Sequence, residues 1–219
     1  IREDAHPHKR DDECVAWVLT PEAARRMNLD ASDEDALVSV EVSLGDVAAI
    51  AYQSPWLGRG SVVLVVAAGL AQSLSGWLAA SGITLEDEGA FHAHRTRCGF
   101  PWFGTDLDES NLPQEADRNE QAISFTKGCY LGQETVARLD ALGQVQKKLV
   151  RWSIRGGVPA SGTALTASDK TVGRLTSVAA GEDGDAIAIG MARRSHFESG
   201  AMARGVDPET QQPLEARVM

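Results

Sequence analysis

The sequence predicts an α+β fold followed by a smaller all-β region, and two patterns predict it. From residue 37 to residue 97, short apolar runs typical of strands are interleaved with stretches of helical spacing. After Gly143, short strand-like runs separated by Gly, Pro, Ser and Asp follow one another at the spacing of a small β-barrel or sandwich. A chain of 219 residues that is 43% hydrophobic and 24% charged can form one large domain or two small ones.

The first 35 residues are polar and weakly patterned. Residues 15–19 are apolar enough for a strand, and residues 21–27 open with Pro21 directly after Thr20, a residue suited to cap a helix. Residues 28–35 are acidic and turn-like. We therefore expect one strand and one short helix before the better-patterned region begins.

The pattern becomes regular from Leu37 onward. Three further strands are predicted, over residues 37–42, 47–52 and 61–66. An amphipathic helix is predicted over residues 70–80, ending before Gly82. A second helix is predicted over residues 83–97, with acidic residues in its first turn and basic residues in its last, which suits the helix dipole.

The middle of the chain predicts a strand followed by a helix. Residues 122–125 are strand-like, and the chain breaks at Gly128. Helical spacing then places four side chains on one face, with Gly143 as a C-terminal stop: Leu131, Thr135, Leu139 and Leu142.

The change of pattern near residue 144 sets the predicted domain boundary. Residues 1–143 form the α+β region, residues 144–206 the β region, and residues 207–219 a polar tail with a disordered or extended finish. Four strands are expected in the β region: residues 148–154, 164–166, 171–177 and 186–191.

Charge and composition exclude several classes of protein. A net charge of −10 and a pI near 5.0 argue against direct binding to a nucleic-acid backbone, since such domains carry a basic stripe. No apolar window reaches the roughly 18 residues that a membrane span needs. Three cysteines at no metal-like spacing predict neither a disulfide framework nor a bound metal, and fit a reducing, cytoplasmic location.

The stretch from Lys127 to Arg138 carries the strongest chemical signal. Cys129 is expected on a turn that enters a helix, where the helix end and Lys127 both favour a thiolate. Gly128 and Gly132 allow a close backbone approach to a ligand. The alternative is that the cysteine is simply a small buried residue.

Two further side chains of this stretch place an amide and a carboxylate in the first helical turn, namely Gln133 and Glu134. Glu134 also stands four residues before Arg138, the spacing of a weak ion pair on a helix surface.

A second candidate lies between Arg95 and Asp106. Its arginine stands at a helix end beside a loop rich in Gly, Pro and aromatic residues, including Trp102. A guanidinium group can hold a carboxylate through two hydrogen bonds, and aromatic side chains can stack on a flat ring. The alternative is a loop that is packed by its own aromatic side chains.

The run from Lys127 to Glu134, Lys-Gly-Cys-Tyr-Leu-Gly-Gln-Glu, resembles the signature of the YgfZ family of folate-binding proteins. That family is related to the glycine-cleavage T-protein, an aminomethyltransferase, and is linked to iron-sulfur cluster assembly or repair and to tRNA modification. The resemblance implies a T-protein-like, folate-binding α+β core with a C-terminal β-barrel. It also implies that a large N-terminal part of the family fold is missing from this chain.

The segment from Arg95 to Asp106 resembles the family's folate-pocket segment in the order of five residues, which are Arg95, Gly99, Pro101, Gly104 and Asp106. Arg97 stands where T-proteins commonly have a glutamate, a departure that weighs more against aminomethyl transfer than against folate binding. The resemblance implies site roles for three sets of residues. The implied catalytic residues are Cys129 and Lys127. The implied tetrahydrofolate-binding residues are Arg95, Trp102, Tyr130, Gln133 and Glu134. The remaining motif positions are Gly128, Gly132 and Arg138.

The resemblance favours a folate-binding accessory protein for iron-sulfur cluster assembly or repair. Its expected partners are a folate and iron-sulfur assembly proteins or client enzymes, with no membrane and no direct nucleic-acid contact. The alternative is a tetrahydrofolate-dependent aminomethyltransferase of the glycine-cleavage type. A scaffold that has lost its ligand is the third possibility.

Overall fold

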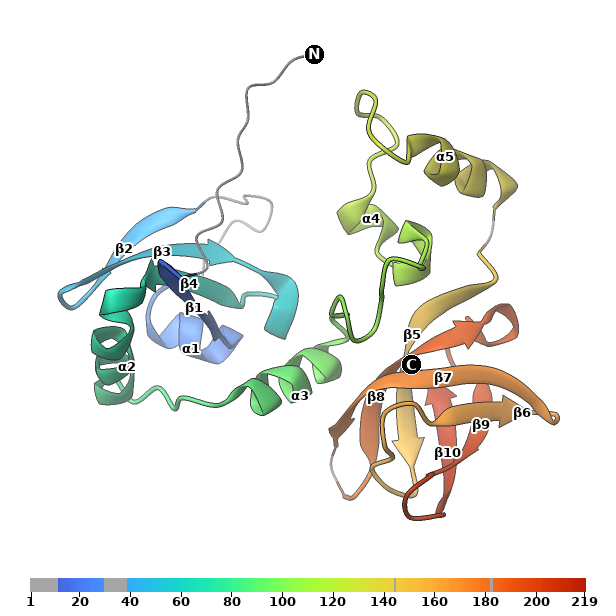
Figure 1. The fold of residues 1–219 in the computed structure, drawn as a ribbon. Coiled ribbons are helices and arrows are strands. Elements are labelled where there is room, and N and C mark those ends of the chain that lie inside the picture. Colours follow the sequence, from blue (N-terminus) through green and yellow to red (C-terminus); the bar gives the residue numbers. More distant parts are fainter. Residues whose placement is uncertain (1–11, 30–38, 144, 182) are drawn as a thin grey trace. The chain divides into compact units, whose positions relative to one another are not determined.

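The computed structural model describes residues 12–29, 39–143, 145–181 and 183–219 (Figure 1). The chain divides into two compact units, Ile1–Phe91 and His92–Met219. Within the described residues, no helix is both long and apolar enough to cross a membrane.

The first unit is built on a four-stranded antiparallel sheet with the order β1-β4-β3-β2. Its strands are β1 (Cys14–Leu19), β2 (Val40–Leu44), β3 (Val47–Gln53) and β4 (Val62–Ala67), and its two complete helices are α1 (Pro21–Arg26) and α2 (Ala71–Ala80). The strands and helices predicted up to residue 80 are confirmed, and the predicted positions Leu37 and Val38 lie outside the described residues.

Local sequence explains these elements well. Thr20 caps α1 by accepting a hydrogen bond from the amide of Ala23 (3.3 Å). Strand β3 alternates buried and exposed residues, whereas β4 is buried along most of its length. Leu74 and Leu78, one helical turn apart on α2, are fully buried in the same apolar cluster as Leu64 of β4. Helix α2 therefore packs against the sheet.

Helix α3 (Glu88–Cys98) begins five residues later than predicted. The reason is a cap: a carboxylate oxygen of Asp87 accepts a hydrogen bond from the amide of Ala90 (2.9 Å). Ile83, predicted as the first helical residue, instead joins the buried cluster of the first unit.

One 3-10 helix and two α-helices lie between α3 and the last part of the chain: η3 (Pro113–Ala116), α4 (Asn119–Ala122) and α5 (Gln133–Leu142). Gly143 stops α5 in the left-handed conformation (φ 81°), as predicted. The strand predicted over residues 122–125 is wrong. Ala122 ends α4, and no strand of the two described sheets pairs with the apolar run that follows.

The C-terminal part of the chain is a closed barrel with the strand order β10-β5-β8-β7-β6-β9 (Figure 1). Its strands are β5 (Lys147–Arg155), β6 (Ala164–Ala167), β7 (Lys170–Ala180), β8 (Ala186–Arg193), β9 (Met202–Val206) and β10 (Pro213–Val218). The α+β class with a C-terminal barrel is confirmed. A closed ring has no open edge, so the barrel, and not the sandwich, is the form that the short strands take.

The tail predicted for residues 207–219 is wrong, because β10 lies inside the barrel between β9 and β5. Leu214, Ala216 and Val218 are buried beside Trp152 and Ile154 in the barrel core. The residues between them, Glu215 and Arg217, face outward. This two-residue alternation is the sequence signal of a strand with one buried face. Because the alternate positions are charged, the segment resembles a polar tail.

Candidate functional site

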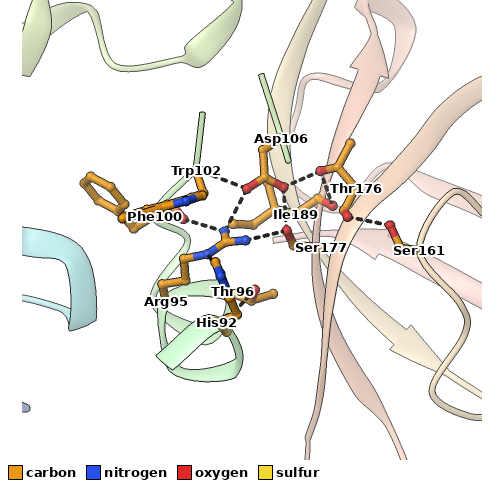
Figure 2. A network of polar contacts seen from close by, with 10 residues as sticks. All are labelled: His92, Arg95, Thr96, Phe100, Trp102, Asp106, Ser161, Thr176, Ser177 and Ile189. Carbon is orange, nitrogen blue, oxygen red and sulfur yellow. Dashed lines mark hydrogen bonds and ion pairs between the residues drawn. The ribbon is translucent and has the colours of Figure 1, made fainter. Parts of the chain in front are cut away.

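Arg95, on α3, is fully buried, and its guanidinium group is bound within the protein (Figure 2). Its Nη1 donates hydrogen bonds to a carboxylate oxygen of Asp106 (2.7 Å) and to the carbonyl oxygen of Phe100 (3.1 Å). Its Nε donates to His92 (2.7 Å) and its Nη2 to Ser177 (3.0 Å). Four of the five N–H groups of an arginine are therefore used internally.

Asp106 is the second buried charge of this network (Figure 2). Its Oδ2 accepts from Arg95 and from the backbone amide of Trp102 (2.8 Å). Its Oδ1 accepts from the hydroxyl groups of Thr176 (2.5 Å) and Ser177 (2.7 Å). A buried carboxylate with four donors is fully satisfied, which is what its burial requires.

The two hydroxyl groups converge because strand β7 is irregular at this point. The β7–β8 register shifts between Leu175 and Ser177, and the intervening Thr176 is the extra residue. Such a bulge lets neighbouring side chains of one strand turn to the same partner. The network therefore fastens the loop after α3 to the barrel, and sequence reasoning missed the roles of Thr176 and Ser177.

The C-terminal end of α3 is held to the barrel by two further arginines. Arg97 donates twice to the carbonyl of Ala180, at 3.1 and 3.0 Å. Arg151 of β5 donates to the carbonyl of Arg97 (2.6 Å), and its side chain fills the space where a Cβ on Gly99 would stand. Gly99 has a φ of +76°, so both conformation and contact require glycine here.

Trp102 is half-buried and lies edge-on to His92, with ring centroids 5.9 Å apart. Phe100 lies under the guanidinium group of Arg118 at 4.8 Å. Phe103, in contrast, is 68% exposed. Two of the three aromatic side chains in this loop are thus engaged within the protein.

The second predicted constellation, residues 127–138, lies in a different environment. Cys129 is exposed, as are Lys127, Gly128, Glu134 and Arg138 of the same stretch. The Nζ of Lys127 lies 4.6 Å from the ring centre of half-buried Tyr130, within the range of a cation–π contact.

The helix after the thiol starts later than predicted. Gly132 is the N-cap of α5, in the left-handed conformation (φ 86°), so Cys129 lies three residues ahead of the cap. The effect of a helix dipole falls off within the first turn. Gln133, which opens the helix, is half-buried, and Val136 is the residue of α5 that is buried.

A small cavity of about 270 Å³ opens beside this loop. Ten residues line it: Pro113, Ala122, Ile123, Ser124, Lys127, Tyr130, Leu131, Gly132, Thr135 and Val136. Arg95 and Trp102 are not among them, so this cavity does not unite the two constellations. Glu134 and Arg138 line a separate hollow of about 360 Å³, without an ion pair between them among the described contacts.

The other two cysteines differ from Cys129. Cys14 is half-buried on β1, and Cys98 is exposed at the end of α3. Partial burial raises the pKa of the Cys98 thiol, against the opposing charges of Arg151 and Arg97. Across the described residues, no group of three or more His, Cys, Asp and Glu side chains is placed to hold a metal ion.

Comparison with known proteins finds a family model for the barrel and relatives that resemble part of the chain. Residues 146–217 match the family model of the CAF17 C-terminal beta-barrel domain. The human protein "Iron-sulfur cluster assembly factor IBA57, mitochondrial" is 39% identical over 101 residues, which are 43% of this chain and 28% of that protein. The "tRNA-modifying protein YgfZ" of Aliivibrio fischeri (strain MJ11) is 32% identical over 115 residues, which are 50% of this chain and 36% of that protein.

The fold is also that of a solved structure, the glycine cleavage system aminomethyltransferase T from Bartonella henselae. The TM-score is 0.75 at 17% identity, and the likeness covers 94% of this chain and 58% of that one. The matches to the two sequence relatives span about a third of their length. The last part of the chain therefore matches the CAF17 C-terminal barrel domain, the chain is similar over part of its length to IBA57 and YgfZ proteins, and its fold is that of the glycine-cleavage aminomethyltransferases.

Proposed function

We propose that this chain is an accessory protein of iron-sulfur cluster assembly or repair, and that the thiol of Cys129 contacts the cluster or the protein that carries it. The names of the human and Aliivibrio relatives, an iron-sulfur assembly factor and a tRNA-modifying protein, support this class of role. The observation that carries the site is the exposure of Cys129 on a loop outside regular structure. A thiol must be accessible to serve as a ligand or nucleophile.

The surroundings of Cys129 favour a protein partner at this loop. Leu131 is 102% exposed and Phe125 is 47% exposed, so two large apolar side chains face solvent beside the thiol. Isolated exposed apolar residues are common, but two of them close in sequence to an exposed thiol favour contact with a partner there. An iron-sulfur assembly protein or client enzyme is the partner that we propose for it.

The proposal is tested by rescue of iron-sulfur enzyme activity in a strain that lacks the corresponding protein. Cys129→Ser should abolish rescue, because a hydroxyl replaces the thiol with little change in shape. Cys98→Ser is the matched control, since Cys98 is also exposed and lies outside the motif. Full rescue by Cys129→Ser, with the protein present at normal abundance, would contradict the proposed role.

Folate binding is the second part of the proposal, because the fold and the family are folate-related in general. Ligand pockets usually span about 300–1,000 Å³. The cavity of about 270 Å³ beside Tyr130 therefore fits a pterin ring but not a whole folate. Tyr130 would stack on the pterin ring, with Lys127 beside it, whereas Arg95 has only one N–H group left.

Equilibrium binding of tetrahydrofolate tests this assignment. Tyr130→Ala should weaken binding about tenfold or more, in line with the loss of one stacked ring. Phe103→Ala is a matched control, because Phe103 is an exposed aromatic side chain of the other loop. Equal loss from both variants, or loss from Phe103→Ala alone, would move the folate site to the loop after α3. Aminomethyl transfer is not proposed, because the likeness to the aminomethyltransferase, at 17% identity, extends to the fold alone.

A further inference from the structure

The barrel differs in charge from the rest of the chain. Residues 147–219 carry ten lysines and arginines against eight aspartates and glutamates, a net charge of +2, whereas the whole chain has a net charge of −10. Residues 1–146 therefore carry −12. A basic region in an acidic protein is the kind of asymmetry that directs an acidic partner to one place.

The outer face of three neighbouring strands, β9, β10 and β5, holds a groove of about 710 Å³. Its lining residues come from these strands and from two short flanking segments: Ser153, Arg155, Ser199, Gly200, Met202, Glu215, Arg217, Val218 and Met219. Arg155 and Arg204 stand directly across from Glu215 in the antiparallel ladders. Among the residues that line the groove, two arginines, Arg155 and Arg217, stand beside one acid, Glu215.

Two of these arginines are free to bind a partner. Within the part of the chain that the structure describes, the guanidinium groups of Arg204 and Arg217 make no ion pair. Arg155 reaches only a distant carboxylate, that of Asp185 at 4.0 Å, and both side chains of this pair are largely exposed. Exposed pairs of this kind contribute about 0–1 kcal/mol, so Arg155 can readily exchange its partner.

The groove is not purely polar. Met202 is 52% exposed and Met219 is 50% exposed, and both line it. Methionine and arginine are both enriched in protein–protein interfaces, where the flexible thioether side chain adapts to its partner. Single-stranded nucleic acids need aromatic platforms for stacking, and no aromatic side chain is among the lining residues.

We propose that this groove is a docking site for an acidic segment of a partner protein, one that places carboxylates on Arg155 and Arg217 and an aliphatic side chain between Met202 and Met219. The inference goes beyond the proposed role of Cys129, because it concerns a different face of the second unit and a different kind of contact. Two hydroxyl groups, of Ser153 and Ser199, supply further donors along the groove.

Fluorescence anisotropy with a labelled twelve-residue peptide of repeating Asp-Leu-Glu tests the proposal, with the full chain as the binding protein. Binding should weaken as salt rises, because ionic contacts are screened. Arg155→Glu with Arg217→Glu should weaken it at least tenfold. Lys170→Glu with Arg193→Glu is the matched control, with the same change in charge at two other exposed barrel positions, and it should leave affinity within about twofold.

Three outcomes would overturn the inference. The first is no binding at peptide concentrations up to about 1 mM, the weak limit of useful affinity. The second is equal loss from both double variants, which would mean bulk charge attraction. The third is tighter binding of a twelve-residue polyuridylate than of the peptide, with the same sensitivity to Arg217→Glu, which would mark a nucleic-acid surface. The Cys129 proposal is tested separately, by rescue of iron-sulfur enzyme activity. Failure of the docking proposal therefore does not decide the Cys129 proposal, or the reverse.

Discussion

The loop from Arg95 to Asp106 buries its charged groups, whereas the loop from Lys127 to Glu134 leaves its charges and its thiol in solvent. Both stretches carry the residue types of a binding site. In the first, every oxygen of Asp106 is taken by the protein's own donors, and the arginine has one N–H group left. In the second, Cys129 is exposed. The comparison shows that burial and partners, and not residue type, distinguish a loop whose polar groups are already bound from one that is free to meet a ligand or partner.

The largest effect is expected from breaking the buried pair. Asp106→Ala leaves the Arg95 guanidinium buried with no counter-charge, and a lost partner of a buried ion pair costs about 3–5 kcal/mol. Urea-induced unfolding measures the loss in the free energy of unfolding. Arg138→Ala is the control from the exposed loop, and it should change stability by no more than about 0.5 kcal/mol. A loss below about 1 kcal/mol for Asp106→Ala would show that the pair does not hold the first loop in place.

Glycine substitutions should separate the two loops again, with smaller effects. Gly99→Ala places a Cβ 2.4 Å from the Arg151 side chain at a φ of +76°, and left-handed backbone alone costs an L-residue about 1–2 kcal/mol. Gly128→Ala meets nothing within 4 Å and has no positive φ. Thermal unfolding should therefore show destabilisation for the first variant and almost none for the second.

The Gly128→Ala variant also sharpens the proposed function. Because the substitution leaves the fold undisturbed, any loss of rescue in the deletion strain would reflect contact between the loop and its ligand or partner. Marked destabilisation by Gly128→Ala would instead mean that this glycine is needed for the loop's own conformation.

The exposed thiol of Cys98 gives a further test, in its rate of reaction. Partial burial raises the pKa of the Cys98 thiol, so a smaller fraction of it is thiolate at a given pH than for an ordinary cysteine. Alkylation by iodoacetamide should therefore be several-fold slower at Cys98 than at a cysteine in an unstructured peptide near pH 8, and the difference should shrink as pH rises through the raised pKa. Peptide mass spectrometry follows each site separately, and a rate at Cys98 equal to that of the peptide would contradict the raised pKa.

What the sequence predicted well was encoded locally. Thr20 before Pro21 marked the start of α1, Gly143 marked the end of α5, and the apolar run over residues 61–66 marked the strand β4. Each of these signals acts within one or two turns of the chain. The exposed Cys129 was also found, because its motif is contiguous.

What the sequence did not predict depends on distant partners. Asp106 is satisfied by hydroxyl groups about seventy positions later in the chain, so nothing near Arg95 indicated that its guanidinium was already bound. Strand β10 forms because β5 and β9 offer it two edges, although its alternate charges resemble a polar tail. The run at 122–125 is the reverse case, with strand-like residues that gain no neighbouring strand. Pairing, and not propensity, decided each of these outcomes.

The smallest effect on stability is expected at Lys127. Its ammonium group lies over the Tyr130 ring at an exposed position, where a cation–π contact contributes about 0.5–1 kcal/mol. Lys127→Met keeps the aliphatic stem and removes the charge, so the free energy of unfolding should fall by about 0.5 kcal/mol or less. Lys170→Met, on the barrel surface, is the matched control for loss of one positive charge. If rescue of iron-sulfur enzyme activity falls for Lys127→Met but not for Lys170→Met, the cation acts on what binds at Cys129. A stability loss above about 1 kcal/mol would instead assign Lys127 to holding its own loop, as Arg95 holds the other.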